Sequence, residues 1–323
     1  KNNLALLIKF RSFKMKKQLL IAAVAATMTS VAMADISISG AAQVNYTTTD
    51  YDAAGTADTN TISHDFDLKV TGKSGATTVV MDIENTDAGA ELADAAINTN
   101  SQEMNVKNAY MATSIAGVNV KMGTWYGSDT LLSNGSQTED QVSLDTTISG
   151  VKVQYEDNMS TSSVTLSGSV AGVKLSHEIF DTKTDTSVSG SFGGVNVAYR
   201  DVDADSDAAD SKTSLEVSTE FQGVTATYAN VDAGTSGTSS DTFFGTVAAA
   251  DMMEADGFGV KTSMAGNTVN LKSYTLKNTS SVDQDYTKLV VTRALASGAT
   301  LEGTYTDKNS VSTALDLELR VKF

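Results

Sequence analysis

Apolar and polar residues alternate over many short stretches of the chain, most plainly over Ser310–Phe323. One parity of this stretch is apolar apart from Thr313, and the other carries four charges: Asp316, Glu318, Arg320 and Lys322. A period of two predicts a β-strand with one aliphatic and one charged face. A soluble β-sandwich also contains amphipathic strands, but this degree of contrast suits a wall with lipid on one side and water on the other.

The same alternation opens the region that begins at Asp35, over Asp35–Tyr46, and recurs over 62–71 and 77–83. The middle of the chain repeats a motif in which Gly-Val begins an alternating stretch. Its copies cover 117–122, 150–155, 172–177, 194–199 and 223–228. Because each Gly ends one alternating stretch and starts another, each copy predicts a tight hairpin turn.

Further short turns at 72–75, 265–267 and 296–298 bring the predicted total to eight. Eight turns between a first and a last strand give nine hairpins and therefore eighteen strands, or sixteen if one hairpin is merged. Longer acidic connections, such as 201–211 and 232–241, alternate with the turns. The predicted fold is therefore an all-β, transmembrane antiparallel β-barrel, with short periplasmic turns and longer extracellular loops. We expect its first and last strands to pair, because an unpaired edge is not tolerated in lipid.

Composition supports a chain made mostly of strands. Among 323 residues there is no Cys and no Pro. The absence of Cys excludes disulfides and Cys metal sites, and Pro cannot donate to a β-ladder. No uninterrupted apolar run reaches about 18 residues, which argues against a helical membrane protein.

Residues 1–34 have the pattern of a processed leader. Met15-Lys16-Lys17 is a basic start, Leu19–Ala26 is an apolar core, and 31–34 reads Val-Ala-Met-Ala. We expect translation to start at Met15, with residues 1–14 lying upstream of it, and cleavage after Ala34. Residues 35–323 would then form a single exported domain; a short amphipathic helix at 1–34 is the less favoured alternative.

The charge of the expected mature domain is strongly negative. Residues 1–34 contain six of the 23 Lys and Arg and none of the 39 Asp and Glu, which leaves 17 basic residues and a net charge of −22. Such a field repels nucleic acid and anions and attracts cations.

Residues 105–132 resemble the Gram-negative general diffusion porins. The stretch combines Lys107, Ala109-Tyr110, a Gly117 turn, an alternating strand and a closing Gly123, although Thr124 stands where the family usually has Arg. The resemblance implies an outer-membrane homotrimer in contact with lipopolysaccharide, and a third loop, 126–140, that folds into the barrel. It also implies that Phe323 is an assembly signal read by the barrel-assembly machinery.

Two sets of charged residues are candidates for a pore constriction. Asp129, Glu139 and Asp140 lie in the expected loop 126–140, where they would favour cations; a solvated surface loop is the alternative. The second set lies on the polar parity of predicted strands and would form the opposite wall, or a plain wet lining: Lys121, Lys152, Lys174, Arg200 and Arg320.

Other features favour structural roles. His64 and His177 are isolated on the apolar parity of separate strands, so no metal site is expected. The stretch 201–207 resembles the start of a calcium-binding loop, but it lacks the Gly at the sixth position and the bidentate Glu at the twelfth position of such a loop. We therefore expect no cofactor, apart from divalent ions bound weakly by loops. Outward-facing tyrosines, Tyr155, Tyr199 and Tyr228, predict an aromatic girdle, with ordinary β-propensity as the alternative.

The leading functional hypothesis is a water-filled outer-membrane channel for passive diffusion of small hydrophilic solutes, preferring cations. No G-x-S-x-G elbow pairs with His and Asp, so we do not expect an enzyme. The first alternative is an exported structural protein, of the surface-layer or adhesin type. The second is a substrate-specific channel, which an aromatic track along the lumen would support; the sequence instead places the aromatic residues outward.

Overall fold

A computed structural model of the chain describes residues 35–86, 90–91, 103–126, 137–205, 211–233, 243–244, 252–278 and 283–323. These residues form strands, turns and short connections. The strands are β1 (Asp35–Tyr51), β2 (Thr59–Ser74), β3 (Thr77–Thr86), β4 (Ala90–Glu91), β5 (Glu103–Ile115), β6 (Val118–Tyr126), β7 (Gln137–Ile148), β8 (Val151–Asp157), β9 (Ser162–Val170) and β10 (Val173–Phe180). They continue with β11 (Lys183–Phe192), β12 (Val195–Ala204), β13 (Lys212–Phe221), β14 (Val224–Asp232), β15 (Met252–Met264), β16 (Asn267–Asn278), β17 (Asp283–Ala294), β18 (Ala299–Lys308) and β19 (Ser312–Lys322).

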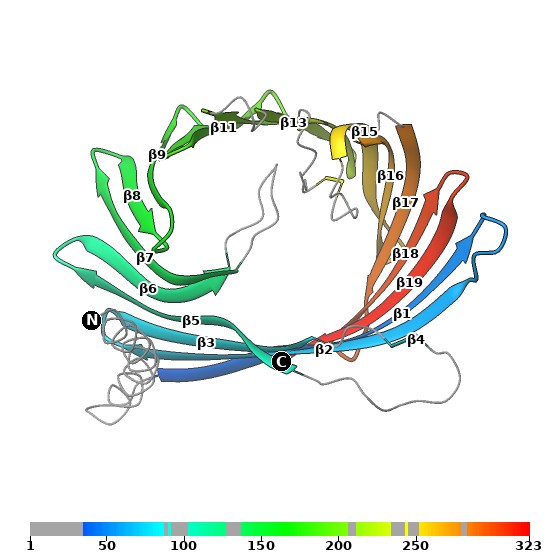
Figure 1. Cartoon of the computed structure of the whole chain (residues 1–323), viewed down its shortest axis with the longest axis horizontal. Coiled ribbons are helices and arrows are strands. Elements are labelled where there is room, and N and C mark those ends of the chain that lie inside the picture. Colours follow the sequence, from blue (N-terminus) through cyan, green and yellow to red (C-terminus); the bar gives the residue numbers. More distant parts are fainter. Residues whose placement is uncertain are drawn as a thin grey trace, which may run out of the picture.

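Eighteen of these strands form one closed antiparallel ring, and the two-residue β4 pairs only with β2. Each strand of the ring pairs with its neighbours along the chain, and β1 pairs with both β2 and β19. Figure 1 shows the ring, with β1 in blue beside β19 in red and β7 to β14 in green on the far side. The predicted eighteen-stranded barrel is therefore confirmed, and the sixteen-stranded alternative is wrong.

The seam between β1 and β19 closes the barrel as the sequence predicts. Val44 lies opposite Leu319 and Tyr46 opposite Leu317, so the alternation of the two strands is in register. Phe323 extends the seam, because its amide and carbonyl exchange hydrogen bonds with Gly40 at 3.0 and 2.8 Å. Closure in this way leaves no unpaired strand edge to face lipid.

The two parities of each strand face different environments. In β19, Leu315, Leu317 and Leu319 are 38–45% exposed on the outer face, whereas Asp316 and Glu318 are half-buried on the inner face. Most exposed aliphatic side chains of the other strands also face outward, whereas Val80, Val231 and Leu276 are buried on the inner face. An apolar exterior and a polar interior is the reverse of a soluble β-protein and the arrangement of a transmembrane barrel.

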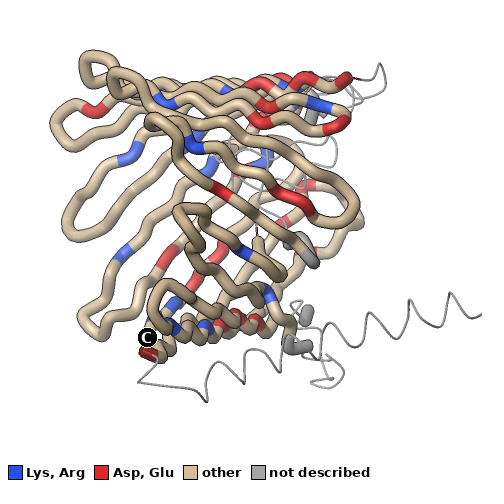
Figure 2. The backbone as a smooth tube through the Cα atoms, turned by 90° about the vertical axis from the view of Figure 1, so that its left-hand side faces the viewer, with Lys and Arg blue, Asp and Glu red and all other residues tan. Residues whose placement is uncertain are grey.

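One rim of the barrel consists of eight short turns, none of which contains a charged residue. Six of them have two consecutive residues with positive φ, as at Ala116 (51°) and Gly117 (83°). That geometry is the type I′ turn, whose twist matches that of the flanking strands. Figure 2 shows this rim at the left, near the C-terminus, with acidic segments more frequent toward the other rim.

The opposite rim is less uniform than predicted. Some connections there are very short: two residues separate Phe180 from Lys183, and three separate Lys308 from Ser312. β12 also continues through Ala204, so Asp201 and Asp203 are strand residues and not part of a loop, contrary to the prediction. Antiparallel pairing with Thr186 and Thr184 of β11 extends the ladder to these positions.

Candidate functional site

The inner wall of the barrel is the candidate functional site, because polar side chains from successive strands converge on it. All five basic candidates lie on the parity opposite to outward-facing aliphatic or aromatic residues, and therefore face inward. Lys121 alternates with Met122, Lys152 with Val151, Lys174 with Leu175, Arg200 with Tyr199, and Arg320 with Leu319 and Val321. Their influence on ion flow stays a prediction.

Lys121 is held between two aromatic rings of the inner wall. Its Nζ lies 4.1 Å from the ring centroids of both Tyr110 and Trp125, which meet edge to face at 6.2 Å. Trp125 is 7% exposed, so the aromatic pair is fixed against the wall. Cation–π attraction and packing therefore restrict where this ammonium group can reach.

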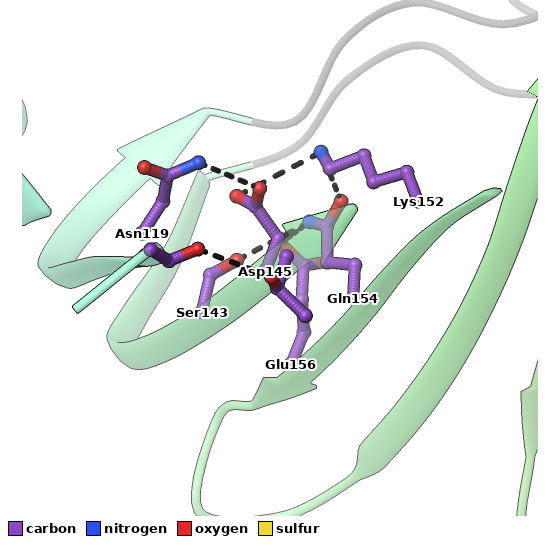
Figure 3. A network of polar contacts seen from close by, with 8 residues as sticks. Asn119, Ser143, Asp145, Lys152, Gln154 and Glu156 are labelled. Atoms are coloured by element: carbon purple, nitrogen blue, oxygen red, sulfur yellow. Dashed lines mark hydrogen bonds and ion pairs between the residues drawn. The ribbon is translucent and has the colours of Figure 1, made fainter. Parts of the chain in front are cut away.

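Lys152 belongs to a network that spans β6, β7 and β8 (Figure 3). Its Nζ lies 3.8 Å from Asp145 Oδ1 and donates to Gln154 Oε1 at 2.7 Å. Asn119 donates to Asp145 at 2.9 Å, and Gln154 donates to Ser143 and Glu156; these bonds measure 3.2 and 2.7 Å. Because donors and acceptors alternate, this part of the wall is polar and ordered.

Arg200 forms an ion pair with Asp185 on the neighbouring strand. Its Nε donates to both carboxylate oxygens of Asp185, at 2.8 and 3.1 Å, and its Nη2 contacts the same carboxylate. The two side chains are only 14% and 10% exposed. The pair joins β11 to β12 and neutralises one charge of each sign on the wall.

Lys174 and Arg320 lie elsewhere on the wall. Lys174 borders a recess of about 340 Å³ with Asn196 and Glu216. Arg320 faces Gln43 across the seam, and its buried Nε has no hydrogen-bond partner among the described residues. The five bases are therefore distributed round the ring, from β6 to β19, and do not form one cluster.

The end of the predicted acidic loop 126–140 belongs to a strand in the structure. Asp129 lies outside the described residues, as does the segment 127–136. Glu139 and Asp140, which the sequence assigns to the loop 126–140, belong to strand β7. The ladder between β6 and β7 includes the pair Tyr126 and Gln137, so β7 begins earlier than predicted. The register of this ladder shifts between Gly123 and Trp125, which leaves Glu139 and Asp140 in the irregular part of β7.

Phe243 and Phe244 lie inside the barrel, which the sequence analysis missed. Their rings meet edge to face at 5.0 Å, and Phe244 packs on Tyr274 at 5.5 Å, which stacks on Tyr286 at 5.1 Å. We call these four residues the aromatic cluster. The prediction that the aromatic residues face outward is therefore wrong for the cluster, and also for Tyr110 and Trp125.

The aromatic cluster is anchored on the inner faces of β14, β15 and β16. Phe243 and Phe244 are 5% and 2% exposed, and small or aliphatic residues support them: Ala229, Val231, Ala233, Ala255 and Leu276. Burial of a Phe side chain contributes about 1.5–3 kcal/mol, enough to hold this part of the connection on the wall. A Cβ on Gly259 would lie 3.0 Å from the Phe243 ring, so the glycine provides the space that the ring fills.

The cluster narrows the barrel from one side. β16 lies across the ring from β7, so the aromatic cluster and the Lys152 network are on opposite walls. One sequence signal was present: two consecutive Phe within a connection otherwise rich in Asp, Gly, Ser, Thr and Ala. A solvated loop rarely presents adjacent large apolar residues, so the pair indicates burial.

The two histidines lie on the outer face, as their parity predicts. His177 Nδ1 is 2.9 Å from Thr186 Oγ1 on the neighbouring strand. Within the described ranges, no group of three or more His, Asp or Glu residues is arranged to hold a metal ion. Tyr155 and Tyr199 face outward and are 38% and 39% exposed.

Comparisons with known proteins identify the fold. No known family and no curated protein matches the sequence. Among solved structures, a triple mutant of the Rhodopseudomonas blastica porin is similar with a TM-score of 0.56 and 13% identity, covering 89% of this chain and 100% of that one. A double mutant of OccD1 (OprD) is similar with a TM-score of 0.60 and 9% identity, covering 91% and 97% of the two chains. The chain therefore has the fold of outer-membrane porins.

Proposed function

We propose that this protein is an outer-membrane channel through which small hydrophilic solutes diffuse passively. The observation that carries the proposal is the closed ring of eighteen strands with an aliphatic exterior and a polar interior. Such a ring leaves no backbone group unpaired toward lipid and can hold water inside. The proposal includes no catalytic step.

Swelling of liposomes in sugar solutions tests this function. Liposomes that contain the refolded protein should swell in a monosaccharide, and the rate should fall steeply with sugar size, because passage depends on the width of the lumen. Protein-free liposomes are the control. Equal rates with and without the protein would contradict the channel and favour an exported structural protein.

A preference for cations is part of the proposal. Its support is the excess of acid in the sequence and the acidic residues toward the rim opposite the short turns. Charges at a channel mouth raise the local concentration of counter-ions. In a potassium chloride gradient across a planar bilayer, the reversal potential should have the sign of cation flow, and the preference should weaken as salt is raised. A reversal potential with the sign of chloride flow would refute it.

The proposed partners are two further copies of this chain, lipopolysaccharide and the barrel-assembly machinery. Strands β8 to β10 contain only seven to nine residues and, tilted by about 45°, span roughly 16–21 Å, less than the hydrocarbon layer. A neighbouring copy packed against the short strands β8 to β10 would shield them from lipid. It would also cover the outward-facing polar pair of His177 and Thr186. Chemical cross-linking in native membranes should give a trimer band; monomer alone would count against the trimer.

The aromatic cluster supports one alternative. The buried cluster occupies space inside the barrel, and a narrower lumen restricts the size and shape of the solutes that pass. A channel that is selective for a class of solute is therefore the second candidate function.

A further inference from the structure

We propose that the inner wall of β10 to β13 binds neutral polyhydroxylated solutes, such as sugars. The inference rests on the proposed channel and names a solute class for its selective form. Two recesses, of about 340 and 310 Å³, open toward the lumen on this wall. Both are lined by Ser189 and Ala198, so they form one groove along the strands, which we call the polar groove. Each recess has the volume of a small-molecule binding site.

The polar groove exists because small inward-facing side chains meet across three strands. Ser176 lies opposite Ser187, and Ser189 lies opposite Ala198 on the next strand. Longer polar side chains border these positions and come from all four strands: Lys174, Glu178, Asp185, Asn196, Arg200 and Glu216. A solute in the groove would therefore lie on a floor of small side chains with polar groups on each side.

The charges that border the polar groove are of both signs. Asp185 and Arg200 neutralise each other in their buried ion pair, which makes this border rigid. Lys174 and Glu216 lie in one row across the strands, at opposite ends of the pair formed by Ser189 and Ala198. One end of this row therefore donates hydrogen bonds and the other accepts them. Because no single sign of charge dominates, the groove favours a neutral solute over an ion.

The polar groups of the groove are not used up by one another. Ser187, Ser189 and Asn196 make no side-chain hydrogen bond with the part of the chain that the structure describes. In the Lys152 network, by contrast, the donors already have acceptors (Figure 3). A serine hydroxyl and an asparagine amide can both donate and accept, and so can every hydroxyl of a sugar. A polyhydroxylated solute can therefore pair with the groove throughout, through neutral hydrogen bonds that are weak enough to permit release.

Saturation-transfer NMR of the folded barrel, in a detergent without a sugar headgroup, tests the groove with sucrose as the probe. Sucrose should bind at least about fivefold more tightly than tetraethylene glycol dimethyl ether, an extended ether that accepts hydrogen bonds but cannot donate them. It should also bind more tightly than spermidine, a cation without hydroxyls. The titration needs no current through the channel, so a barrel that fails to conduct would refute the proposed function without deciding this site.

Two substitutions separate the shape of the groove from its hydrogen bonds. Ala198→Leu fills the part that the two recesses share and removes no polar group, so it should weaken sucrose binding at least about fivefold. Ala314→Leu is its matched control, because Ala314 also faces the lumen but belongs to β19. Ser189→Ala keeps the shape and removes one hydroxyl, so it should weaken binding about threefold. Its control is Ser63→Ala, on the inner face of β2.

Equal affinities for sucrose and the ether would overturn the inference, and so would tighter binding of spermidine, which would indicate a site for cations. Equal effects of Ala198→Leu and Ala314→Leu would also overturn it, as would equal effects of Ser189→Ala and Ser63→Ala. A channel that conducts but gives any of these results would refute the sugar site and leave the proposed function standing.

Discussion

At the scale of single residues, the closure of the barrel depends on one glycine. A Cβ on Gly40 would lie 2.6 Å from Phe323 Cζ and 2.5 Å from the Asp67 carbonyl oxygen. The Phe323 ring therefore lies over Gly40 on the outer face, where it also stacks on Phe66 at 6.2 Å. This contact gives Phe323 a structural function at the seam, in addition to the proposed role as an assembly signal.

Gly40→Val should lower the thermal stability of the folded barrel, because the new side chain displaces Phe323 and strains the pairing of β1 with β2. Overpacking of this kind costs about 1–3 kcal/mol. Gly72→Val is the control: Gly72 is also a strand glycine without positive φ, and its Cβ would meet no atom within 4 Å. Band-shift thermal melts in mild detergent measure both, and equal midpoints would show that the contact does not stabilise the seam.

At the scale of elements, the strands and turns follow from local sequence. Alternation of side chains decides which face of a strand meets lipid, and a shift by one residue would reverse every side chain, so the pattern determines the register. The turn glycines identify each hairpin, and eight turns are present, although the one predicted at 72–75 lies at residues 75–76, because β2 continues through Ser74. Strand ends beyond the turns were harder to predict: β7 and β12 extend into segments whose polar composition is typical of loops.

The turns also predict the effect of a substitution. Ala116 has a φ of 51°, which Asn tolerates better than Ala and which β-branched residues resist. Ala116→Asn should therefore raise the stability of the barrel by about 0.5 kcal/mol, and Ala116→Val should lower it by about 1 kcal/mol or more. Urea titrations followed by Trp125 fluorescence measure the difference; the opposite order of the two variants would contradict the type I′ assignment.

At the scale of the whole molecule, the inner wall combines three parts from distant segments. The Lys152 network, the Arg200–Asp185 pair and the aromatic cluster lie on different strands of the ring. Parity alone places the charged residues of the Lys152 network and of the Arg200–Asp185 pair on the inner face. It cannot place Phe243 and Phe244, because they belong to a connection whose path depends on contacts with β14, β15 and β16 and not on local periodicity.

The central claim is that the ring encloses an open aqueous passage, which Phe243 and Phe244 narrow. Single-channel recording in planar bilayers tests it most directly, with the wild type, the double variant Phe243→Ala/Phe244→Ala and a control that removes two outward-facing rings, Phe192→Ala/Phe221→Ala. The wild type should give discrete conductance steps, the lumen variant steps roughly 1.5- to 2-fold larger, and the control the wild-type value. Failure of the wild type to give any step, or equal conductance in all three proteins, would contradict the account.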